Sequence, residues 1–264
     1  MSDEAAALTG FTRRRVTLAG ETKDVYERGE GPPVIVMAEI PGITPRVLDF
    51  ARRVVDHGMT AVLPQLFGTP GAPPTPLALA RTIAHACISR EFAMLARREA
   101  SPVTEWLRAL ARSLHEASGG PVGAVGMCLT GNFALTLALD PWLMAPVLSQ
   151  PSLPLRIPGG ARALHASEHT QQTVARRVRD EGLSVLGLRF THDPMCPRAR
   201  FEALSDLLGD GFESIEIDSG PGNPHGHRRM AHSVLTEDLI DDEGQPTRRA
   251  MERVLEFLQQ RLQG

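Results

Sequence analysis

The sequence alternates short, continuously apolar runs with longer segments whose apolar residues recur at helical spacing. Val34 to Ala38 is one such run, and it fits a strand that is buried on both faces. Thr44-Pro45 then predicts the start of a helix, and Gly58 predicts its end. Thr60 to Leu66 returns to strand character. Two strands joined by a helix in this way predict a parallel sheet.

The same order continues to the end of the chain. Further strands are predicted at Pro121 to Met127, Ala145 to Ser149, Ser184 to Phe190 and Ser214 to Asp218. Helices are predicted from Ser101-Pro102 to Gly119, at Leu129 to Leu139, Gln171 to Arg179 and Phe201 to Leu208, and from Pro246 onward. About six strands in one sheet indicate a single α/β domain over residues 1–264, mostly parallel, with helices on both faces.

One stretch departs from this alternation. Gly68 to Pro76 is dense in proline and glycine, and Leu77 to Arg98 has the pattern of one or two helices. This insert, around residues 68–100, follows the end of a predicted strand. Ligands of open α/β sheets bind beyond the carboxyl ends of the strands. The insert is therefore either a long surface connection or a cap over a pocket.

Composition narrows the function classes. The formal net charge is −3, so no overall positive charge favours nucleic acid or a membrane surface as a partner. No run of about 18 apolar residues predicts a membrane-spanning helix. The acidic, alanine-rich N-terminus does not resemble a secretory signal, which favours a cytoplasmic location. The three cysteines, Cys87, Cys128 and Cys196, do not make a disulfide framework.

The strongest chemical signal is the segment Gly126-Met127-Cys128-Leu129-Thr130-Gly131 between a predicted strand and a predicted helix. A nucleophile elbow requires a sharp turn at this place, with small flanking residues and the nucleophile at the tip. Cys128 stands at that tip, at the positive end of the next helix, where a thiolate is favoured. The alternative interpretation is a small apolar residue packed in a turn.

A nucleophile on this fold is followed along the chain by an acid and then a base. Asp193 comes just after the strand that ends at Phe190, where a carboxylate could orient an imidazole, although an aspartate there could also form a turn. Three histidines, His225, His227 and His232, follow the last predicted strand. The order therefore holds, but spacing alone leaves the base open among the three.

Four segments resemble the dienelactone hydrolase family of α/β-hydrolases. They are Met37 to Gly42, Gly126 to Gly131, His192 to Pro197 and Ala231 to Val234, and with the terminal helix the resemblance spans residues 34 to 258. It implies a single-domain α/β-hydrolase fold. It also implies Cys128 as the nucleophile, His232 as the general base and then acid, and Asp193 as the orienting carboxylate.

The resemblance implies further roles. The glutamate that matches Glu39 interacts with the resting thiol in the family and helps to control its ionisation. Backbone N–H groups of Leu129 and Ile40 would form the oxyanion hole. Arg90 is one candidate for gripping a substrate carboxylate; Arg228 and Arg229 are others. The implied substrate is a small-molecule ester or lactone, no metal or organic cofactor is required, and the protein is a monomer or small homo-oligomer.

The sequence also departs from the family pattern. Thr130 stands where the family has glycine, which predicts a slightly wider contact between helix and strand. The loop before His232 is longer than expected and adds His225 and His227 as competing bases. Ser233, Val234 and the following helix favour His232.

Two other functions remain open. One is an α/β-hydrolase fold that binds a ligand without catalysis. The other is a metal-dependent enzyme whose ligands come from the histidine-rich loop, namely His225, His227 and His232 with Asp218 or Asp238. The irregular spacing of these histidines disfavours the second.

Overall fold

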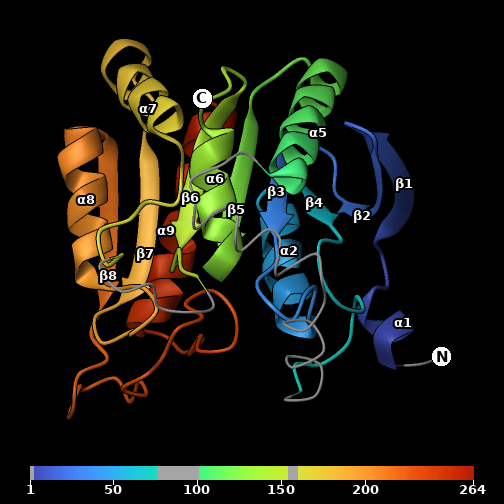
Figure 1. Ribbon diagram of the computed structural model, residues 1–264. Helices are drawn as coiled ribbons and strands as arrows, with labels where there is room; N and C mark the ends of the chain where they lie inside the picture. The colour runs from blue at the N-terminus through green and yellow to red at the C-terminus, as the bar shows by residue number, and fades with distance from the viewer. Residues whose placement is uncertain (1–2, 76–100, 154–159) are drawn as a thin grey trace.

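The computed structural model of the protein describes residues 3–75, 101–153 and 160–264. Within these ranges eight strands form one sheet in the order β1-β2-β4-β3-β5-β6-β7-β8 (Figure 1). The strands are β1 (Thr12–Leu18), β2 (Glu21–Arg28), β3 (Pro33–Met37), β4 (Thr60–Pro64), β5 (Val122–Met127), β6 (Leu143–Ser149), β7 (Val185–Phe190) and β8 (Phe212–Ile217). From β4 to β8 every neighbouring pair is parallel.

Helices flank this sheet. They are α1 (Asp3–Ala7), α2 (Pro45–Asp56), α5 (Pro102–Ser118), α6 (Gly131–Leu137), α7 (Glu168–Glu181), α8 (Arg198–Leu208) and α9 (Pro246–Leu262), with the 3-10 turns η1 (Cys128–Thr130) and η2 (Gly209–Gly211). The predicted mostly parallel α/β fold is confirmed. Residues 76–100, which include most of the predicted cap-like insert, lie outside the described residues.

The number of strands differs from the prediction. The first two strands, β1 and β2, form an antiparallel hairpin, and β2 joins the sheet by pairing antiparallel with β4. Ala19 and Gly20 turn the hairpin with positive φ angles of 48° and 80°. The sequence pattern did not reveal β1 because most of its side chains, including three consecutive arginines, are exposed. A strand without a buried face lacks the apolar signal on which the prediction depended.

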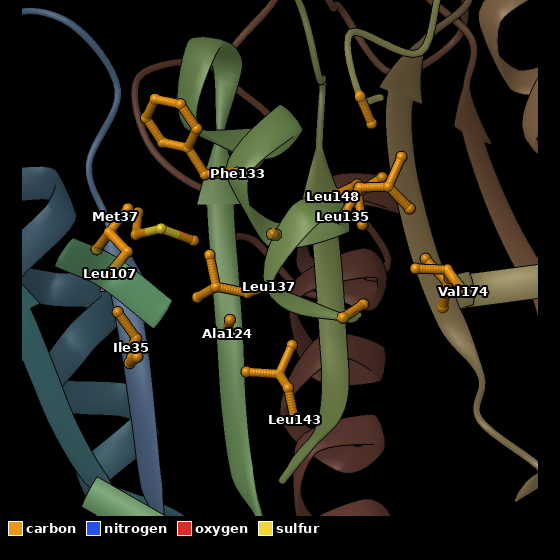
Figure 2. Close-up of a cluster of buried hydrophobic side chains, with 14 of the residues drawn as sticks. Ile35, Met37, Leu107, Ala124, Phe133, Leu135, Leu137, Leu143, Leu148 and Val174 are labelled. Atoms are coloured by element: carbon orange, nitrogen blue, oxygen red, sulfur yellow. The ribbon is translucent and has the colours of Figure 1, made fainter. Parts of the chain in front are cut away.

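Buried side chains form one core on each face of the sheet. Residues of α5, α6, α7 and α8 pack on one face, and residues of α2 and α9 pack on the other. Figure 2 shows part of the first core, with Phe133 and Leu137 of α6 near Met37 and Ala124 of the sheet. Because both faces are covered, the central strands are apolar throughout, and this is why their positions could be predicted.

The predicted helix starts are also confirmed. The side chains of Thr44 and Ser101 accept hydrogen bonds from the N–H groups of Val47 and Thr104, as expected of N-cap residues. Gly119 ends α5 with a left-handed φ of 69°. The predicted helix over Leu129 to Leu139 is instead divided into η1 and α6. No helix in the described ranges is long and apolar enough to span a membrane.

Candidate active site

Cys128 lies at the sharp turn between β5 and α6. Its φ angle is +57°, in the left-handed region that non-glycine residues rarely adopt. Such strained conformations gather at functional sites. A Cβ atom added at Gly126 would lie 2.2 Å from the Thr130 carbonyl oxygen, so only glycine fits there. The local sequence therefore builds the turn geometry of a nucleophile elbow, with Cys128 partly exposed at its tip.

Thr130 is part of this turn. Its fully buried hydroxyl oxygen accepts a hydrogen bond from Met127 N–H at 2.8 Å. The same hydroxyl group is close enough to donate its hydrogen to either of two carbonyl oxygens, that of Met37 at 2.7 Å or that of Met127 at 2.9 Å. The hydroxyl group thus joins the end of β5 to the end of β3. The threonine that departs from the family pattern ties the two strands together at the turn.

Asp193 and His232 form a close pair. The Asp193 Oδ2 atom lies 2.7 Å from His232 Nδ1, and the Asp193 side chain is fully buried. The other carboxylate oxygen accepts a hydrogen bond from Met195 N–H at 2.9 Å, which fixes the carboxylate. A carboxylate on Nδ1 holds the imidazole in the tautomer with a hydrogen on that nitrogen. The Nε2 atom is then available to accept a proton.

The Cys128 sulfur also affects the pKa of the His232 imidazole. Burial by itself would lower the pKa of His232, but the thiolate charge of Cys128 and the hydrogen bond to Asp193 raise this pKa well above its usual value of 6.5. Nε2 is buried without a well-formed hydrogen bond to any described residue. The sulfur is nevertheless close enough to affect the titration of the ring.

The Asp238 carboxylate helps to position the loop that carries His232. Asp238 Oδ2 accepts hydrogen bonds from the backbone N–H groups of His232 at 2.8 Å and Ser233 at 3.1 Å. Its other oxygen accepts a hydrogen bond from the Arg228 Nε atom at 3.1 Å. Arg228, one of the candidate substrate clamps, is therefore already paired.

The competing histidines have other partners. His227 is buried, its ring centroid lies 5.2 Å from that of Phe190, and burial lowers its pKa. The His225 ring lies beside His227, with centroids 6.4 Å apart. Among the described residues, no group of three or more His, Cys, Asp or Glu side chains is arranged to hold a metal ion. The imidazoles of this loop therefore have different neighbours and do not converge on one metal-binding centre in the described residues.

Glu39, which the resemblance relates to the resting thiol, has three hydrogen-bond partners in the structure. Its buried carboxylate accepts hydrogen bonds from Ser233 Oγ at 2.7 Å, from the Thr236 hydroxyl group and from Gln150 Nε2 at 3.3 Å. Two of these donors belong to the loop that carries His232. Glu39 thus holds that loop to the end of β3, and no hydrogen bond joins it to Cys128 in the described residues.

Sequence reasoning missed Ser152. This fully buried residue follows β6, and its hydroxyl group donates a hydrogen bond to Cys128 Sγ at 3.2 Å. It was missed because a serine beyond a strand end has no distinctive pattern. The one signal that could have indicated Ser152 is the parallel pairing of β6 with β5, which places the carboxyl ends of these two strands side by side.

Arg200 was also missed. It is only 5% exposed, and its guanidinium donates to the carbonyl oxygens of Pro151 at 2.6 Å and Met195 at 3.3 Å. Burial lowers the pKa of Arg200. Its contacts tie the segment beside Cys128 to the segment that holds Asp193. Because α8 supplies this residue, its helical pattern gave no reason to place it near a site.

The two residues expected to supply the oxyanion hole follow neighbouring strands. β3 and β5 pair in parallel, with Met37 opposite Gly126, so Ile40 and Leu129 both lie beyond the same edge of the sheet. Leu129 is the second residue of η1, where backbone N–H groups lack intrahelical partners. Arg90 lies outside the described residues, and Arg229 is exposed on the histidine loop.

The other cysteine of the described residues is chemically distinct. Cys196 is completely buried, and burial, followed by the charge of Asp193, strongly raises its pKa. A thiol in this state is a poor nucleophile. Only Cys128 combines partial exposure with a neighbouring imidazole among the described cysteines.

A parallel sheet flanked by helices, with a turn after β5 that presents one side chain beside a histidine–aspartate pair, defines an α/β-hydrolase. More narrowly, the chain belongs to the dienelactone hydrolase family, because the model of the "Dienelactone hydrolase family" matches residues 17–262. It is accordingly a hydrolase that acts on ester or lactone bonds. A comparison with curated protein sequences gave no significant match.

Solved structures support the same fold. The chain is 19% identical to a putative dienelactone hydrolase from Klebsiella pneumoniae subsp. pneumoniae, with a TM-score of 0.61 over 95% of this chain and 99% of that one. A dienelactone hydrolase-like promiscuous phosphotriesterase from metagenomic libraries gives 18% identity and a TM-score of 0.60 over 96% and 99%. A cold-adapted esterase from an Arctic intertidal metagenomic library gives 14% identity and a TM-score of 0.60 over 96% and 95%.

Proposed function

We propose that the protein hydrolyses a small-molecule ester or lactone with Cys128 as the nucleophile. The observation that carries the proposal is that Cys128 stands at a strained turn beside the imidazole of His232, which Asp193 holds at 2.7 Å. This arrangement contains a nucleophile, a base and a residue that orients the base, which together suffice for acyl transfer.

In the first step the thiolate of Cys128 attacks the carbonyl carbon of the substrate. The proton of the thiol resides on His232 Nε2, and Asp193 stabilises the resulting imidazolium. The backbone N–H groups of Leu129 and Ile40 would stabilise the negative charge that develops on the carbonyl oxygen. His232 then donates its proton to the departing alkoxide, and a thioester with Cys128 remains.

In the second step a water molecule hydrolyses the thioester. Nε2 of His232, now neutral, takes a proton from the water as it attacks the acyl carbon. Collapse of the tetrahedral intermediate expels the Cys128 thiolate and releases the carboxylic acid. For a lactone, both the alcohol and the acid belong to one product, because the leaving alkoxide remains attached through the acyl chain.

The test is turnover of an activated aryl ester by the Cys128→Ala variant. We expect turnover to fall to the uncatalysed rate while the unfolding transition stays close to that of the wild type. Cys196→Ala is the control, since it removes the buried thiol instead, and it should retain turnover. Mass spectrometry of a rapidly quenched reaction should show the acyl group on Cys128. Retained turnover by Cys128→Ala would contradict the proposal, and binding of esters without turnover by the wild type would favour a non-catalytic role.

A further inference from the structure

The contact between Ser152 and Cys128 is the least explained feature of the site. The Ser152 hydroxyl group donates its hydrogen to Cys128 Sγ over 3.2 Å, and the Ser152 side chain is fully buried. The residues lie 24 positions apart in the sequence. The hydroxyl group is therefore directed at the sulfur by tertiary structure and not by a local turn.

Several bonds hold Ser152 in this position. Its backbone N–H donates to the Cys128 carbonyl oxygen at 3.1 Å. The side-chain amide of buried Asn132 donates to the Ser152 carbonyl oxygen at 2.9 Å and to the Leu129 carbonyl oxygen at 3.0 Å. Arg200 binds the carbonyl oxygen of the preceding Pro151 at 2.6 Å. Such fixation is what a preorganised hydrogen-bond donor requires.

The direction of the hydrogen bond decides its effect. A donor directed at a sulfur favours the negatively charged thiolate over the neutral thiol, because hydrogen bonding to the charged form stabilises that form. A carboxylate beside the sulfur would favour the protonated thiol instead, through like-charge repulsion. Here the Glu39 carboxylate is bonded to Ser233, Thr236 and Gln150, and the contact to the sulfur is made by a hydroxyl donor.

We propose that Ser152 is a further catalytic residue, whose hydroxyl group stabilises the Cys128 thiolate both when it attacks and when it is expelled. The proposal rests on the proposed function of Cys128. Ser152 keeps its own proton throughout: the proton that leaves the thiol goes to His232. When the C–S bond breaks in the second step, the negative charge returns to sulfur, where the hydroxyl group can stabilise it again.

The proposal can be tested without turnover, by the pH dependence of thiol alkylation. Iodoacetamide reacts with thiolates, and peptide mapping by mass spectrometry separates Cys128 from the other two cysteines. In Ser152→Ala the alkylation midpoint of Cys128 should move to higher pH by about one unit, as expected for the loss of one hydrogen bond to a charged group. In Ser152→Thr, which keeps a hydroxyl group, the midpoint should stay near that of the wild type.

A matched control separates this effect from the loss of any buried hydroxyl group. Thr173→Ala removes a buried hydroxyl group from α7, a helix that carries none of the residues discussed at the site. This variant should leave the alkylation midpoint of Cys128 unchanged. Thermal unfolding confirms that each variant is folded. An unchanged midpoint in folded Ser152→Ala would overturn the role of Ser152, whereas retained turnover in Cys128→Ala would overturn the proposed function itself.

Discussion

The hydroxyl oxygen of Thr130 lies 2.7 Å from the backbone carbonyl oxygen of Met37. This contact connects the nucleophile turn to a strand 93 residues away in the sequence. Since the same oxygen accepts a hydrogen bond from Met127, the turn and both strand ends form one unit. The position of Cys128 relative to the backbone that follows β3 depends on this unit.

We expect Thr130→Val to lower the free energy of unfolding by about 1–3 kcal/mol, because it leaves a buried N–H group and a buried carbonyl unpaired. Urea unfolding measures this change. Thr136→Val is the control: its half-buried hydroxyl group donates to the Asn132 carbonyl oxygen in α6 at 3.2 Å, and its loss should cost about 0.5 kcal/mol or less. Equal losses in the two variants would contradict the structural role of Thr130.

Asp193→Asn should lower kcat for an aryl ester by about 100-fold or more. The amide has nearly the same shape, but it cannot stabilise a protonated His232 as a carboxylate does. Steady-state kinetics with the activated ester measure the effect. Asp218→Asn is the control, because Asp218 follows the neighbouring strand β8 and accepts a hydrogen bond from Gly220 N–H. A similar loss in both variants would show that the effect is not specific to the pair.

The raised pKa of His232 predicts a pH-dependent stability. A group whose pKa is higher in the folded state than in the unfolded state stabilises the fold when it is protonated. This contribution is fully present below the unfolded value of 6.5 and is lost as the pH rises through the folded pKa. We therefore expect the stability difference between the wild type and His232→Gln to shrink as the pH is raised above 6.5.

Urea unfolding at a series of pH values measures this difference. His169→Gln, a substitution of an exposed histidine on α7, serves as the control and should give a difference with little dependence on pH. In a Cys128→Ala background the dependence should weaken, since the thiolate charge is one of the groups that raise the His232 pKa. A stability difference that grows with pH would contradict the direction of the shift.

Glu39→Ala should destabilise the protein by about 3 kcal/mol or more, because it leaves the donors of Ser233, Thr236 and Gln150 without a buried acceptor. Glu39→Gln keeps one acceptor oxygen and should lose less. Chemical unfolding gives both values, and Glu243→Ala, at an exposed position that precedes α9, should have little effect. If Glu39→Ala were as stable as the wild type, Glu39 would not anchor the His232 loop.

Much of the fold could be predicted from the sequence, because the central strands β3 to β7 are almost entirely buried on both faces. Their apolar runs predicted the strands, and the capping residues Thr44 and Ser101 predicted the helix starts, to within a few residues. The hairpin of β1 and β2 could not be predicted in the same way, since its exposed arginines hide the alternation.

Some residues of the candidate site could likewise be predicted from the sequence, and others could not. Cys128 and Asp193 could be selected because each follows a predicted strand in the order of an α/β-hydrolase. The same order left three histidines as candidate bases, and the family resemblance favoured His232 among them. Ser152 and Arg200 could not, because their contacts join segments 24 and 49 residues apart without any motif. The hydrogen bonds of Glu39 to Ser233, Thr236 and Gln150 could not be predicted either, because they depend on three-dimensional packing.

Cys128, Ser152, Asp193 and His232 stand beyond the ends of four different strands, β5, β6, β7 and β8. The segment between β8 and His232 can change in length or composition without altering a core side chain of the central strands. Loops of this kind tolerate substitution, and directed evolution of this chain toward other substrates should therefore begin at the exposed positions among residues 221–230.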